Sequence, residues 1–122
     1  MRPVVFSHSQ PPVVQDHPRP ERLVQGNPAR GTQSFYASGD RLLDCGIWSC
    51  EIGAWRIRFS PTRDEFFTVM QGLVRLHAED GESFDVAAGD AAVIPAGFTG
   101  VFEVVEPVRK YYVLLERQPD AG

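Results

Sequence analysis

From Thr32 onward the sequence is a series of short runs in which apolar and polar residues alternate. The clearest run is residues 55–59, WRIRF, in which the odd positions are apolar and the even positions are arginine. A period of two places successive side chains on opposite faces of a strand. The runs are short and no segment shows a sustained helical period, so the pattern predicts an all-β sandwich or barrel.

Residues that favour turns separate these runs. Residues 79–82 predict a hairpin turn with Gly81 at the position of positive φ, and turns are also expected at 88–90 and 95–97. The strands predicted between the turns are 32–36, 46–51, 55–59, 65–71, 73–78, 83–86, 91–94, 98–105 and 110–116. That number of short strands is enough for two packed layers of sheet.

The prolines divide the chain into an arm and a body. Six of the ten prolines lie in residues 1–31, and proline excludes a long helix or a central strand there. We predict an extended, Pro-rich N-terminal arm over 1–31, a barrel over 32–118 and a C-terminal tail over 119–122. The arm could cross to a second subunit and cover a sheet edge, or fold back on its own barrel, and we expect a homodimer.

Composition excludes several classes of partner. Twelve basic and sixteen acidic residues give a formal net charge of −4, which does not favour binding to phosphate backbones or anionic lipid. No window approaches the roughly 20 apolar residues of a membrane span, and the first residues lack the apolar run of an export signal. We expect a cytoplasmic protein with no nucleic-acid or membrane partner.

Two residue types draw attention by their placement. Cys45 and Cys50 lie five residues apart in a predicted strand. At ~3.3 Å per residue their Cα atoms would be about 16 Å apart, which is beyond the reach of a disulfide.

Lys110 is the only lysine in the chain, and the other eleven basic residues are all arginine. An ammonium is more compact than a guanidinium, and burial shifts its pKa more readily. Lys110 therefore marks either a special site or a single exception to a codon preference.

Two stretches framed by glycine have the spacing of known motifs. In residues 53–72, the frame G-x5-H-x-H-x3-E-x6-G is reproduced by Gly53, Glu65 and Gly72, with Phe59 and Pro61 at the histidine positions. These frame positions resemble the first motif of the cupin family.

The second stretch has the frame G-x5-P-x-G-x2-H-x3-N. Gly89, Pro95 and Gly97 match it, while Gly100 and Val104 stand at the His and Asn positions. The two stretches together resemble the paired motifs of cupins. The resemblance implies a cupin-type double-stranded β-helix, that is, a jelly-roll barrel.

In metal-binding cupins, the histidines and glutamate of these motifs converge on a divalent cation. This sequence matches that set only at Glu65, and a single carboxylate is too few ligands for a transition-metal site. The three histidines, His8, His17 and His77, are scattered and are expected on the surface. We predict no bound metal and no cofactor.

The resemblance can be narrowed. Residues 46–48, 51–56, 64–66, 89–98 and 106–113 are similar to small single-domain cupins that resemble the cupin domain of ureidoglycine aminohydrolase. The similarity covers roughly residues 20–117. The resemblance implies the fold strongly. It implies the reaction only weakly, because many members of this branch are of unknown function and are expected to lack the metal histidines, whereas the aminohydrolase uses a manganese site.

Aromatic residues from several strands are expected at the mouth of the barrel. Such walls, with a few polar groups, are typical of small-molecule pockets, although the same rings could simply fill the core. The predicted ligand-binding residues are Trp55, Phe59, Phe67, Phe98, Phe102 and Tyr112.

Glu65 and Lys110 are the predicted catalytic residues. A carboxylate inside an apolar barrel must be paired or protonated, and Lys110 is the natural partner if even positions of 109–115 face inward. The opposite phase would turn Arg109 and Tyr111 inward.

Three hypotheses follow for this pair. It could hold a small amino-acid-like or ureide-like metabolite in a metal-free pocket. It could act as acid and base in a hydrolase or isomerase. It could also only join two strands in a structural dimer with a filled barrel.

Overall fold

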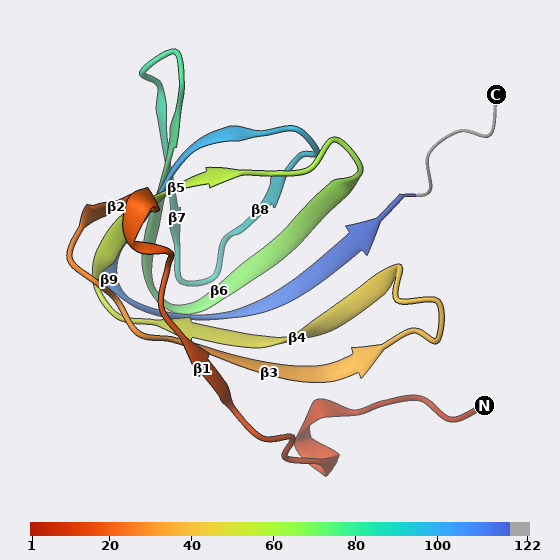
Figure 1. Ribbon diagram of the computed structural model, residues 1–122. Coiled ribbons are helices and arrows are strands. Elements are labelled where there is room, and N and C mark those ends of the chain that lie inside the picture. The colour runs from red at the N-terminus through yellow and green to blue at the C-terminus, as the bar shows by residue number, and fades with distance from the viewer. Residues whose placement is uncertain (118–122) are drawn as a thin grey trace, which may run out of the picture.

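The computed structural model describes residues 1–117, which form an all-β fold (Figure 1). The strands are β1 Val14–Asp16, β2 Leu23–Gln25, β3 Arg30–Ala37, β4 Leu43–Cys50, β5 Gly53–Arg58, β6 Arg63–Ala78, β7 Ser83–Ala87, β8 Ala91–Ile94 and β9 Thr99–Glu116. Two short 3₁₀ turns, η1 Phe6–His8 and η2 Pro20–Arg22, lie in the arm. Neither turn is long or apolar enough to cross a membrane. The tail predicted over 119–122 lies outside the described residues.

The strands form one antiparallel sheet that curls over on itself (Figure 1). The long strands β6 and β9 pair along their whole length and run through both layers. The C-terminal half of β9 pairs with β4, and its N-terminal half pairs with β5. One layer therefore has the order β1-β3-β4-β9-β6-β8 and the other β2-β5-β9-β6-β7. The predicted all-β, cupin-type jelly roll is confirmed.

The structure corrects four predicted strand boundaries, because β6 and β9 are each one long, bent strand where two shorter strands were predicted. Residues 65–71 and 73–78 belong to one strand, β6, and residues 99–105 and 110–116 belong to another, β9, which begins one residue after the predicted start at 98. The register of the β6–β9 pair shifts between Val69 and Val74, where Gly72 has φ +93°. A Cβ at Gly72 would lie 2.1 Å from the Pro107 carbonyl oxygen. Gly72 and Pro107 thus mark a bend between the two layers rather than a break in the strands.

The arm folds back on its own barrel, one of the two arrangements that the sequence left open. Strand β1 pairs with β3, and β2 pairs with β5, so the arm covers an edge of each layer. Figure 1 shows the arm, in red and orange, crossing the barrel between these two edges. The Phe6 ring stacks on Phe35 with a centroid separation of 4.2 Å. Regular structure therefore begins within the arm, and β3 already begins at Arg30.

The inner faces of the two layers form the core, and the alternation in β5 is observed as predicted. Trp55 is buried and Ile57 half-buried, while Arg56 and Arg58 are exposed. Cys45 and Cys50 both lie on β4 as free thiols. Burial raises the pKa of the Cys50 thiol to about 12, so this side chain is a neutral part of the core.

Candidate functional site

The inner faces of the strands do not fill the barrel. They enclose a cavity of about 410 Å³, which falls within the usual range for small-molecule sites. The aromatic side chains therefore leave the barrel partly empty, whereas the third hypothesis, a structural dimer, required a filled barrel. The cavity is lined by Asp16, Arg30, Thr32, Asp44, Trp48, Trp55, Ile57, Phe59, Arg63, Glu65, Ile94, Phe102, Lys110, Tyr112 and Leu114.

Strand register explains which side chains reach the cavity. On β9, Lys110 and Tyr112 are buried and Tyr111 is exposed, so the even positions face inward. Lys110 pairs across with Trp48 of β4, and Leu114 is the register partner of both Asp44 and Glu65. The inward rows of β4, β9 and β6 thus bring one ammonium and two carboxylates to the same cavity.

Lys110 and Glu65 form the predicted ion pair. The Lys110 Nζ donates a hydrogen bond to Glu65 Oε2 at 2.6 Å, and the two side chains are only 4% and 12% exposed. At this depth an unpaired charge would be strongly unfavourable, so each group needs the other as its ionic partner. Among the charged residues of 1–117, Lys110 is the one that is buried.

Three aromatic rings surround the Lys110 ammonium. Its Nζ lies 4.1 Å from the ring centroid of Phe67, 4.6 Å from that of Trp48 and 4.9 Å from that of Phe102. These distances fit cation–π contacts, which are stronger where the cation is desolvated. A compact ammonium fits between the rings, which gives a structural reason for the single lysine in a chain that otherwise uses arginine.

A second polar group lies around Asp44. Ser34 donates a hydrogen bond to Asp44 Oδ1 at 2.6 Å, and the Tyr112 hydroxyl lies 3.4 Å from the same oxygen. Burial and then the Asp44 charge raise the pKa of Tyr112 to about 12. Tyr112 is therefore a neutral phenol at physiological pH; its single O–H is directed to Asp44, and its oxygen can accept a hydrogen bond from a group in the cavity.

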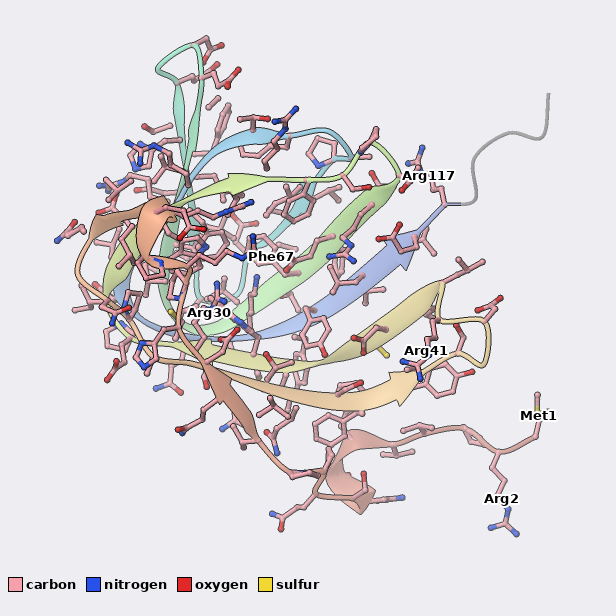
Figure 2. All side chains as sticks on the ribbon, viewed as in Figure 1. Met1, Arg2, Arg30, Arg41, Phe67 and Arg117 are labelled. Atoms are coloured by element: carbon pink, nitrogen blue, oxygen red, sulfur yellow. The ribbon has the colours of Figure 1, made fainter. Side chains whose placement is uncertain are left out.

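The arm supplies the rim of the cavity. Arg30 forms a two-point ion pair with Asp16 of β1, with N···O distances of 2.8 and 2.7 Å. Its guanidinium also lies over the Trp55 ring, 5.2 Å from the centroid. Figure 2 shows Arg30 beside β1, facing the space that the curled sheet encloses.

Four of the six predicted wall residues line the cavity: Trp55, Phe59, Phe102 and Tyr112. Phe67 and Phe98 do not. Phe67 is fully buried beneath the Lys110 ammonium, and Phe98 packs against the core with its ring near Gly100. The period-two pattern predicted the inner face correctly but could not separate the floor of the cavity from the core below it.

Sequence reasoning missed Asp44 and the rim residues. Asp44 shares the parity of Gly46 and Trp48 on a predicted strand, a signal that could have placed it inward. Asp16 and Arg30 carry no such signal, because their position depends on how the arm pairs with the barrel.

A jelly roll whose barrel contains the two motif-like stretches, residues 53–72 and 89–104, has the architecture of a cupin. The sequence matches the profile of the EutQ-like cupin domain over residues 37–112. The chain therefore belongs to the EutQ-like cupin family.

Solved structures share this fold. A Pseudomonas syringae pv. tomato protein of unknown function from the DUF861 family superposes with a TM-score of 0.74 at 21% identity, over 84% of this chain and 43% of that one. The chain thus spans less than half of that protein. The EutQ protein of Clostridium difficile gives 0.64 at 22% identity, over 80% of this chain and 78% of its own. A putative ethanolamine utilization protein Q from Salmonella typhimurium gives 0.65 at 17%, over 90% and 100%.

These similarities establish the family and the fold, and leave the ligand open. No protein with a curated description matches the sequence significantly. The family match does not specifically point to ureidoglycine aminohydrolase, so that narrower resemblance stays a prediction.

The residues at the family's metal positions do not fit a metal ion. Phe59, Pro61 and Gly100 offer no donor side chain, and Glu65 already accepts a hydrogen bond from the Lys110 ammonium. A Cβ at Gly100 would lie 2.1 Å from the His77 carbonyl oxygen, so a histidine could not be accommodated without backbone movement. Within residues 1–117 no three His, Cys, Asp or Glu side chains are grouped as a metal site.

The histidines lie elsewhere in the fold. His8 is in η1 and exposed, and His17 is also exposed, with Nδ1 3.2 Å from the Asn27 carbonyl oxygen. His77 Nε2 pairs with Glu103 at 2.8 Å. None of the three lines the cavity.

Proposed function

We propose that the barrel binds a small polar metabolite of the amino-acid or ureide class, held by side chains rather than by a metal. The observation that carries this proposal is the cavity of about 410 Å³ in which charged groups of both signs are set among aromatic walls. Pockets of this kind recognise a ligand by shape through the rings and by orientation through a few polar groups.

The polar groups suit a ligand that carries several N–H donors. Glu65 Oε2 accepts from Lys110, while within residues 1–117 no hydrogen bond to Glu65 Oε1 is present, and the side chain keeps 12% exposure. Asp44 adds a second carboxylate to the cavity lining. The amino, amide or ureido N–H groups of a ligand can donate to these oxygens and to the Tyr112 hydroxyl oxygen, whose own O–H is directed to Asp44.

The proposal predicts a specific loss of binding in Asp44→Asn. This nearly isosteric change removes a cavity carboxylate, and charge-assisted hydrogen bonds are the strong ones, so affinity should fall about tenfold or more. The measurement is isothermal titration with hits from a thermal-shift panel of amino acids, N-carbamoyl amino acids and ureides.

The matched control is Asp85→Asn, which removes a carboxylate from an exposed ion pair with Arg75 outside the cavity. It should leave affinity unchanged. A panel that gives no saturable shift with the wild-type protein, or equal losses in the two variants, would contradict the proposal.

The same geometry favours a second candidate, acid–base catalysis on such a ligand. A carboxylate with one free oxygen beside an ammonium at 2.6 Å can exchange a proton with a bound substrate. The test follows turnover of each panel hit by NMR. Catalysis predicts that Glu65→Gln abolishes turnover while the protein still melts cooperatively, whereas intact turnover in that variant would exclude Glu65 as the acid or base.

A further inference from the structure

A second hollow, of about 310 Å³, lies beside the mouth of the barrel. Its walls are the arm around η2, the part of β5 beyond its pairing with β2, and the turn that follows β5. It shares five lining residues with the barrel cavity: Arg30, Trp55, Ile57, Phe59 and Arg63. The two hollows therefore adjoin.

Arginine dominates this hollow, which we call the arginine groove. Six of the eleven arginines in the chain line it, and no Asp or Glu among residues 1–117 does so. The chain as a whole carries a net charge of −4, so the groove is a local reversal of the overall charge. Its arginines are Arg19, Arg22, Arg30, Arg56, Arg58 and Arg63.

Only two of these arginines have an ionic partner within residues 1–117. Arg30 pairs with Asp16 and Arg63 with Glu116. The other four form no ion pair in the described part of the chain. Guanidinium groups gathered around one hollow repel each other, and a hollow with aromatic walls focuses their field on whatever occupies it. A bound anion would relieve this repulsion.

We propose that the arginine groove binds a phosphate group. A guanidinium presents its donors in a planar fork that matches phosphate or carboxylate oxygens. Four unpaired guanidinium groups exceed the single charge of a carboxylate and suit a phosphate monoester, which carries about −1.5 to −2 at neutral pH.

The position of the groove extends the ligand proposed above. In this proposal one ligand extends past the five shared residues, with its phosphate end among the arginines and its amino-acid-like or ureide-like end toward Glu65 and Asp44. The barrel end of this ligand rests on the proposed function, whereas the phosphate site does not. The substrate class is thus a small phosphorylated metabolite with N–H donors.

The test compares two double variants that each remove two positive charges. Arg22→Gln with Arg58→Gln alters the groove and breaks no ion pair within residues 1–117. Arg41→Gln with Arg109→Gln is the control, because both residues are exposed and line neither the groove nor the cavity. Binding of inorganic phosphate, O-phosphoserine and serine is measured by calorimetry, with chloride held at equal ionic strength.

We expect wild-type protein to bind phosphate, the groove variant to bind it about tenfold more weakly or worse, and the control to change less than about twofold. No phosphate binding above chloride, or equal weakening in both double variants, overturns the phosphate site.

The three ligands separate this inference from the proposed function. Tighter binding of O-phosphoserine than of phosphate, reduced by Asp44→Asn, supports the ligand that spans both hollows. Equal affinity for phosphate and O-phosphoserine overturns the barrel end and leaves the phosphate site standing. Binding of serine without phosphate overturns the phosphate site and leaves the barrel proposal standing.

Discussion

Glu65→Leu is expected to lower the free energy of unfolding by about 3–5 kcal/mol, because it leaves a buried charge without its partner. Lys110 is 3% exposed, and within residues 1–117 the only hydrogen-bond partner of its ammonium is Glu65 at 2.6 Å. The three surrounding rings attract the ammonium but cannot neutralise it. Urea unfolding at neutral pH, followed by tryptophan fluorescence, measures the loss.

The double variant Glu65→Leu with Lys110→Met tests whether the unpaired ammonium causes this loss. It removes both charges and keeps apolar volume at both positions, and such replacements are often neutral or stabilising. We expect it to recover most of the loss, to within about 1 kcal/mol of the wild type. Losses that simply add would show that the two side chains are not energetically coupled.

Gly72→Ala is expected to cost about 4 kcal/mol or more, or to prevent folding, because it combines a forbidden backbone conformation with a severe contact. Gly72 has φ +93°, and a Cβ there would lie 2.1 Å from the Pro107 carbonyl oxygen and 2.8 Å from the Val108 Cα. These are backbone atoms of β9, so no side-chain rotation can relieve the contact. The measurement is thermal and urea unfolding of the purified variant.

Gly81→Ala is a matched control that isolates the cost of placing alanine at a positive φ. Gly81 has nearly the same φ, +92°, but a Cβ there would meet nothing within 4 Å. The expected loss is therefore only the conformational cost, about 1–2 kcal/mol. Equal losses at the two glycines would mean that the bend between β6 and β9 can relax, and that Pro107 does not require a glycine opposite it.

Much of the fold follows from local patterns in the sequence. Alternation in residues 55–59 predicted the inner face of β5 because strand geometry has a period of two. The spacing of the two glycine-framed stretches resembles that of the cupin motifs, and this resemblance implied the jelly-roll barrel. Gly72, for example, has a positive φ and leaves no room for a Cβ beside the Pro107 backbone, at the bend in the paired strands β6 and β9.

Part of the site also follows from simple physical chemistry. A carboxylate placed inside an apolar barrel needs a partner, and this requirement pointed from Glu65 to Lys110, with which it forms the buried ion pair. The same parity rule, applied to β4, would have added Asp44. Local sequence thus indicated that Glu65 needs a partner and made Lys110 the candidate, whereas the structure decided that the even positions of β9 face inward.

Other features depended on contacts between distant segments. The arm brings Arg30 and Asp16 to the rim, and η2 and β5 together form the arginine groove. No periodicity encodes these placements, because they arise from the pairing of β1 with β3 and of β2 with β5. The division between cavity and core at Phe67 likewise depends on how both layers pack. Strand geometry is local and can be inferred from neighbouring residues, whereas the hollows depend on which edges the chain covers when it folds.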